Sequence, residues 1–177
     1  MADSAGPSFA VVARPRSFLR ADLQGAGFTS WRTWQELRES AFKEVPRTAG
    51  TYLVYRPSAA APKFVAVGTG GHFKRRDPNV PVATLRAKRV PGAHTVYLGK
   101  GDKLQTRLKT YARFGAGEPV AHWGGRYIWQ LADADELLVA WRELGEDFET
   151  ARLDEIALLA RFAELYDGRR PFANLTG

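Results

Sequence analysis

The feature that most constrains the fold is the alternation of short β-type segments with longer helical ones. Residues 51–56 and 94–98 are rich in aromatic and β-branched residues, and glycines follow the second segment directly. Residues 103–114 and 150–166 instead repeat apolar residues at helical spacing. Strands need partner strands, and helices with one apolar stripe need a surface to cover. The pattern predicts an α+β fold with a small central, mostly antiparallel β-sheet flanked by helices.

Weaker signals fill in the remaining elements. Trp31, Trp34, Leu37 and Ala41 recur at helical spacing, so one or two helices are expected over residues 14–44, with Thr29 or Ser30 as a cap. Further strands are expected over 63–67, 126–131 and, with helix as the alternative, 137–141.

These elements suggest a division of the chain into two parts. Residues 1–45 are interpreted as an N-terminal helical extension, whose first nine residues look frayed, and residues 46–177 as the main domain. The main domain carries an insertion at about 57–93, whose later part is basic and interrupted by prolines. This later part, residues 71–93, is expected to form a long loop.

Composition excludes several kinds of chemistry. The chain has no cysteine, which rules out disulfides, cysteine-bound zinc and a thiol nucleophile. Its three histidines, His72, His94 and His122, include no pair at helical metal-ligand spacing. A hard metal held by carboxylate and water remains open. No apolar run reaches membrane-spanning length and no secretory signal is seen, so a cytoplasmic protein without a membrane partner is expected.

Charge is distributed unevenly along the chain. The net charge is +7, yet residues 1–131 hold 21 basic and 8 acidic residues, whereas residues 133–164 hold 3 basic and 10 acidic ones. A basic surface beside an acidic helical flank favours a polyanionic partner, most simply nucleic acid. The alternative is an ordinary solvated surface rich in arginine.

Two charged residues fall on helix faces that are otherwise apolar. Arg107 lies on the side of Leu104 and Tyr111, and Glu155 lies on the side of Leu158 and Phe162. A lone buried charge is costly, so each needs a partner or a function. Three interpretations stay open: a buried Arg107–Glu155 ion pair, boundary positions whose charged ends reach water, or an active-site pair that holds phosphate and a divalent metal.

An ordered set of motifs resembles the GIY-YIG nuclease family. Residues 50–52 (GTY) stand where that family has its first motif, and residues 96–100 (VYLGK) where it has its second. Residues 101–111 resemble the helix that follows, Glu155 the family's metal-binding glutamate, and residues 171–175 (PFANL) its closing segment. Threonine and leucine replace the signature isoleucines, and 45 residues separate the two motif tyrosines.

The resemblance implies a metal-dependent endonuclease that hydrolyses phosphodiester bonds in DNA. A tyrosine would position or activate water, Lys100 would lower the pKa of a phenol, and Arg107 would hold the scissile phosphate. Glu155 would bind Mg²⁺ or Mn²⁺. The implied catalytic set is Tyr52, Tyr97, Lys100, Arg107, Tyr111, Glu155 and Asn174.

Basic residues of the insertion are candidates for phosphate contacts, with a solvated loop as the alternative. The proposed nucleic-acid-binding set is Lys74, Arg75, Arg76, Arg86, Lys88, Arg89 and Lys103. The segment from His122 to Arg126 could form a supporting or substrate loop. Two other functions stay open: a non-catalytic nucleic-acid-binding module, and a partner-binding module with a structural Arg107–Glu155 pair. Oligomeric state is not indicated.

Overall fold

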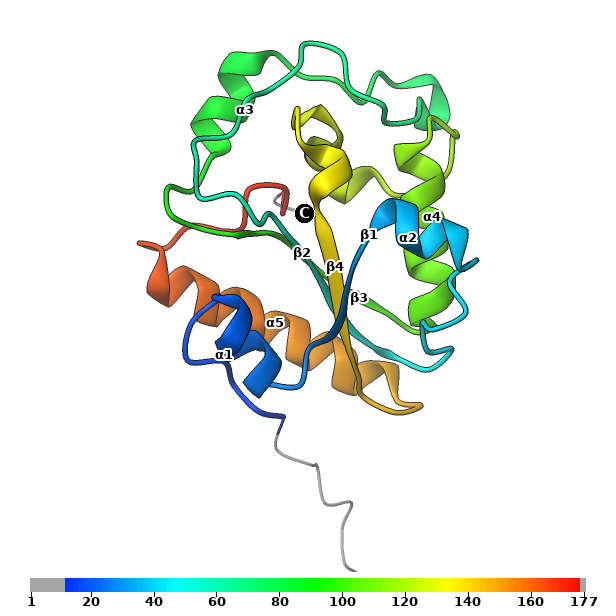
Figure 1. Cartoon of the computed structure of the whole chain (residues 1–177), viewed down its shortest axis with the longest axis vertical. Coiled ribbons are helices and arrows are strands. Elements are labelled where there is room, and N and C mark those ends of the chain that lie inside the picture. The colour runs from blue at the N-terminus through cyan, green and yellow to red at the C-terminus, as the bar shows by residue number, and fades with distance from the viewer. Residues whose placement is uncertain (1–11, 176–177) are drawn as a thin grey trace, which may run out of the picture.

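The computed structural model describes residues 12–175, and within them a four-stranded antiparallel sheet has the order β1-β4-β2-β3 (Figure 1). The predicted α+β class is confirmed. The strands are β1 (Thr29–Thr33), β2 (Gly50–Tyr55), β3 (Thr95–Gly101) and β4 (Leu138–Glu143). Three of them match the expected strands over 51–56, 94–98 and 137–141. The frayed segment expected at residues 1–9 lies outside the described residues.

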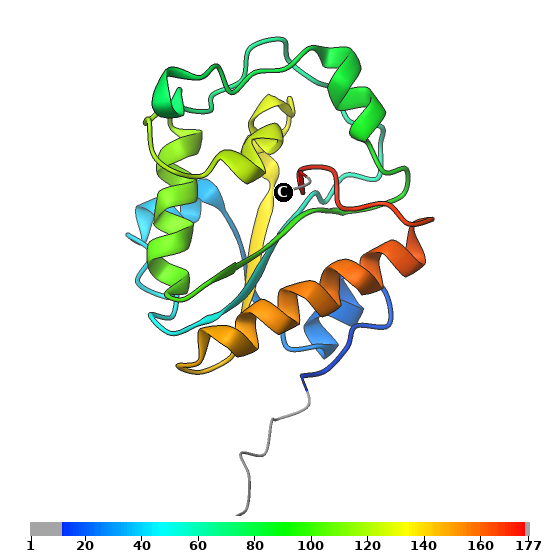
Figure 2. The ribbon, with the colours of Figure 1, turned by 180° about the vertical axis from the view of Figure 1, so that it is seen from behind.

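Helices cover both faces of this sheet. Helices α1 (Arg20–Gly25) and α5 (Phe148–Leu165) lie on one face, and α2 (Trp34–Glu39) and α4 (Leu104–Gly115) lie on the other (Figures 1 and 2). Strand β2 is buried along its whole length because it is central and covered on both sides. Its Tyr52 and Val54 join the core beneath α4, whereas Leu53 and Tyr55 join the core beneath α5.

An irregularity in β3 decides which side chains face which helix. Tyr97 pairs with Val54 but Thr95 pairs with Tyr55, so Val96 is an extra residue in the ladder. Tyr97 therefore faces α4, while Lys100, which is paired with Thr51, lies on the α5 face. Strand β3 is also an edge strand of the sheet.

The single helix expected through Trp31 and Trp34 is wrong. Residues Thr29–Thr33 form β1, which pairs with β4, and α2 starts only at Trp34 after a capping box between Thr33 and Glu36. Trp31 packs in the α5-side core and Trp34 in the α4-side core, so the two rings lie on opposite faces of the sheet. Their helical spacing is a coincidence across a strand–helix boundary.

Two other expected strands are also absent from the described structure. Residues 63–67 form only an isolated bridge between Phe64 and Leu131. Residues 126–131 lie mostly in a 3₁₀ segment, η2 (Trp123–Gln130). The Gln130 side chain donates to the carbonyls of Val65 and Val80, so a side chain satisfies backbone groups that a strand partner would otherwise bind.

The insertion is more ordered than the expected loop. It contains the 3₁₀ turn η1 (Phe73–Arg75) and the helix α3 (Val82–Lys88), and it arches above the sheet (Figure 1). A further 3₁₀ turn, η3 (Ala134–Glu136), precedes β4. Among residues 12–175, no helix is both long enough and apolar enough to cross a membrane.

Candidate functional site

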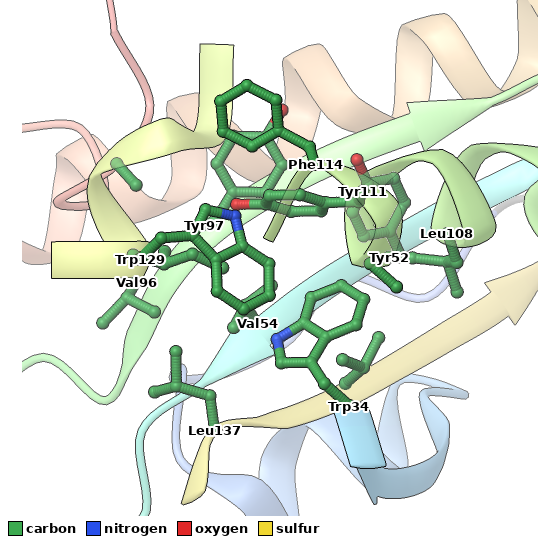
Figure 3. Packing of buried hydrophobic residues seen from close by; sticks show 14 of the residues in the cluster. Trp34, Tyr52, Val54, Val96, Tyr97, Leu108, Tyr111, Phe114, Trp129 and Leu137 are labelled. Carbon is green, nitrogen blue, oxygen red and sulfur yellow. The ribbon is translucent and has the colours of Figure 1, made fainter. Parts of the chain in front are cut away.

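Three tyrosines from three elements meet beneath α4. The ring centroids of Tyr52 on β2 and Tyr97 on β3 are 5.9 Å apart, and Tyr111 on α4 lies 5.4 Å from Tyr97 (Figure 3). Gly99, opposite Tyr52 in the ladder, makes room for this cluster. A Cβ atom at Gly99 would lie 2.6 Å from the Tyr52 ring. The three tyrosines of the catalytic set that the family resemblance implied therefore lie close together.

His122 completes this cluster and was not in the predicted catalytic set. Its ring stacks on Tyr111 with centroids 3.5 Å apart, and its Nε2 lies 3.0 Å from the Tyr52 hydroxyl. The side chain is buried, and its Nδ1 has no hydrogen-bond partner among the described residues. The sequence signal for this role was weak, since only a loop with two following glycines marked the histidine.

Burial controls the ionisation of the whole cluster. It raises the pKa of Tyr52 and of Tyr111 well above the usual 10.0, and the neighbouring Tyr97 adds to both shifts. Burial also raises the pKa of Tyr97, although Arg107 opposes the change. Burial, helped by Arg107, holds the pKa of His122 well below 6.5. At neutral pH the three phenols and the imidazole are therefore uncharged.

Arg107 is the cation of this cluster. It is half-buried on α4, beside the phenols of both Tyr52 and Tyr97. Gly101 lets the arginine stem approach β3 closely, because a Cβ there would lie 3.0 Å from the Cβ of Arg107. The Arg107–Glu155 ion pair, one of the open interpretations, does not form, since each residue lies beside a different face of the sheet.

Glu155 pairs with Lys100 instead. The Lys100 ammonium donates to the Glu155 carboxylate across the α5 face of β3, with the lysine side chain 29% exposed and the glutamate 15% exposed. Lys100 therefore neutralises a carboxylate, while the cation that opposes the rise in the phenol pKa is Arg107. The predicted effect of Lys100 on a phenol is replaced by this ion pair.

A second, deeper ion pair lies one residue away. Asp154 receives two hydrogen bonds from Arg142 and one from Thr51, and both charged side chains are about 95% buried, with exposures of 4% and 5%. Arg142 also donates to the carbonyls of Ala13 and Ala26. Asp154 lies three residues after buried Ala151 and four before Leu158, so helical spacing could have identified it.

Asn174 lies at the β3 edge. Its side-chain amide accepts from the Leu98 N–H at 2.8 Å and donates to the Leu98 carbonyl at 2.7 Å. The adjacent Ala173 N–H donates to the Val96 carbonyl. The C-terminal segment thus covers the first half of the edge, whereas the half around Lys100 has no such backbone partner among residues 12–175.

The carboxylate of Glu155 is the metal-ligand candidate that sequence predicted at this site. Among residues 12–175, no group of three or more His, Asp or Glu side chains is placed to enclose an ion. Glu155 offers one carboxylate, and its Oε1 has no hydrogen-bond partner among the described residues. Mg²⁺ commonly binds through one or two carboxylates together with water and substrate phosphates. Glu155 is a carboxylate of that kind, and it is paired with Lys100 in this structure.

The predicted nucleic-acid-binding residues do not form one patch. Lys74, Arg75 and Arg76 lie at the η1 end of the insertion, near the top of α4, whereas Arg86, Lys88 and Arg89 lie at the α3 end (Figure 1). Lys103 is exposed at the start of α4. Arg89 is half-buried and its carbonyl accepts from Arg169.

The chain was also compared with known proteins. No protein-family model matches it, and neither a curated protein nor a solved structure gives a match.

Proposed function

We propose that the protein is a metal-dependent endonuclease that hydrolyses phosphodiester bonds in DNA at the edge of β3. The observation that carries the proposal is the grouping of Tyr52, Tyr97 and Tyr111 with Arg107 on one face of the sheet, while the Lys100–Glu155 pair lies on the other face of the same edge strand. Arg107 from α4 and Glu155 from α5 both influence the pKa of the Tyr97 phenol, although they come from helices on opposite faces of the sheet. An edge strand allows the two helices to present opposite charges to one substrate.

The charges of these groups match the needs of phosphoryl transfer. Arg107 would hold the non-bridging oxygens of the scissile phosphate, since a guanidinium forms paired hydrogen bonds with phosphate. A half-buried arginine also stabilises charge that develops in the transition state more strongly than a fully exposed one would. Tyr97 would hold the attacking water through its hydroxyl.

The raised phenol pKa values argue for positioning rather than for proton removal. A tyrosine with a pKa above 10.0 is almost entirely protonated at neutral pH and is a poor general base. In this proposal the Tyr52–His122 hydrogen bond fixes the orientation of the Tyr52 phenol beside Arg107. The histidine thus serves as a positioning residue.

Glu155 would hold the divalent cation, and Lys100 would move from the carboxylate to a phosphate oxygen when DNA binds. The metal would supply charge stabilisation at the leaving oxygen. The ion pair with Lys100 holds the Glu155 carboxylate in place before the substrate arrives.

A non-catalytic nucleic-acid-binding module is the second candidate. The observation in its favour is that Tyr52 and Tyr111 are fully buried and Tyr97 nearly so. In that case the tyrosines would be core residues, and Arg107 with Lys100 would contact phosphates without cleavage. Cutting assays separate the two functions.

The test uses supercoiled plasmid and a branched DNA, with Mg²⁺, Mn²⁺ or EDTA. Glu155→Gln keeps the size of the side chain but removes the charge, and it should reduce metal-dependent cutting by at least about 100-fold. Glu149→Gln is the matched control, because Glu149 is exposed on the same helix and pairs only with Arg152 among the described residues. Equal cutting by wild type and Glu155→Gln would reject the proposal.

A further inference from the structure

Two arginines share one tryptophan at the η1 end of the insertion. The guanidinium carbon of Arg76 lies 4.6 Å from the centroid of the Trp123 ring, and that of Arg126 lies 4.4 Å from it. Arg126 also contacts the Tyr127 ring and donates to the Trp123 carbonyl at 3.1 Å. Segments about 50 residues apart in sequence therefore place two cations on one indole.

Neither arginine has an acidic partner among residues 12–175. None of the ion pairs there involves Arg76 or Arg126, and the buried Nε of Arg126 has no hydrogen-bond partner. The carboxylate next in sequence, Asp77, is directed elsewhere: it accepts two hydrogen bonds from Asn79 and lies 3.8 Å from His72. The result is a concentration of positive charge that the other residues between 12 and 175 leave uncompensated.

The two cations repel one another. Burial is the main reason that the pKa of Arg126 is lowered, and the charge of Arg76 contributes to the same shift. Like charges held together cost free energy, and an anion between or beside them would recover it. A cation–π contact that only stabilised Trp123 would need one arginine. The second arginine, Arg76, is exposed and is therefore not part of the buried core.

The pair also lies next to the proposed active site. Trp123 directly follows His122, whose Nε2 contacts the Tyr52 hydroxyl. Trp123 itself packs against the core that contains the three tyrosines. The position of the two guanidiniums is thus tied to the same rigid cluster.

We propose that Arg76 and Arg126, stacked on Trp123, form a clamp for the phosphodiester backbone of the nucleic acid, on the His122 side of the site. This inference rests on the proposed function for its polymer but concerns binding alone. It selects Arg76 among the basic residues of the insertion and gives a specific role to Arg126, which the sequence analysis placed only within a supporting or substrate loop.

The test measures binding of fluorescein-labelled DNA and RNA, single-stranded and duplex, by anisotropy across a salt series in EDTA, so that cleavage plays no part. The variants are Arg76→Gln, Arg126→Gln and the double variant. Arg152→Gln on α5 is the control, because Arg152 is exposed and paired with Glu149. Arg76 is exposed, so Arg76→Gln decides the result if Arg126→Gln fails to fold.

Each clamp variant should lower the slope of log affinity against log salt by about 0.9 on duplex DNA or about 0.7 on single strands, while the control leaves it unchanged. A loss on DNA and RNA alike would identify the shared backbone as the ligand, and a loss on one polymer would identify that polymer. An unchanged slope for Arg76→Gln overturns the clamp and leaves the nuclease proposal standing. A lowered slope in a protein that cuts no DNA supports the clamp and counts against the nuclease.

Discussion

Asp154 and Glu155 are neighbours in α5, yet their carboxylates sit in contrasting environments. Asp154 lies beneath the helix, where Arg142 and Thr51 satisfy it and water is almost excluded. Glu155 lies at the open edge of β3, where a single lysine holds it and part of each side chain reaches solvent. The comparison shows how one residue step along a helix separates a charge in a deeply buried, fully paired network from a charge in a partly exposed pair.

The largest effect should come from breaking the deep pair. Asp154→Ala leaves the Arg142 guanidinium buried without its counterion, and we expect a loss of about 3–5 kcal/mol in the free energy of unfolding. Guanidinium chloride denaturation measures this. A loss below about 1 kcal/mol would mean that the two carboxylates do not differ as their burial indicates.

A pH series extends the comparison to the α4 face. The pKa of His122 is held well below its unfolded value of 6.5, so the unfolded chain binds the extra proton first as the pH falls. Stability should therefore be full above pH 6.5 and should decline below it, by up to about 1.4 kcal/mol per pH unit, until the pH reaches the folded pKa. Denaturation of wild type and His122→Asn at several pH values isolates this contribution, which the variant should lack.

A third prediction concerns the two hydrogen bonds between the Asn174 side chain and the backbone of Leu98 at the edge of β3. Asn174→Ala removes both hydrogen bonds to Leu98, and we expect a loss of about 1–2 kcal/mol, since the site is only partly buried. Hydrogen exchange would locate the effect: the backbone amides of Leu98 and Ala173 should exchange more slowly in the wild type than in the variant. Asn174→Asp keeps the acceptor and loses the donor, so it should fall between the two.

The smallest effect on stability should come from the edge pair. Glu155→Gln removes an ion pair that solvent partly screens, and its cost should stay below about 1 kcal/mol in the same denaturation assay. Together with the expected loss of cutting, this would separate the role of Glu155 in function from any role in folding. If Glu155→Gln lowered the free energy of unfolding as much as Asp154→Ala, both carboxylates would act mainly to stabilise the fold.

Local sequence determined most of the framework. The strands around Tyr52 and Tyr97 could be predicted because aromatic and β-branched residues gather there, and helices α4 and α5 because their apolar residues repeat at helical spacing. The strand around Val139 was expected only with a helix as the alternative. The same periodicity placed Arg107 and Glu155 on the inner sides of their helices. These properties depend on neighbours within about seven residues, which a sequence displays directly.

Tertiary structure decided what periodicity could not express. Trp31 and Trp34 fit one helix by spacing, but pairing with β4 made the first a strand residue and placed the two rings on opposite faces of the sheet. The partner of Glu155 proved to be Lys100, 55 residues away, and the partner of Tyr52 proved to be His122, 70 residues away. Sequence shows which charged side chains need a partner, because a charge on an otherwise apolar helix face can be recognised from its neighbours in sequence. Only the packing of strands and helices determines which distant group meets that need.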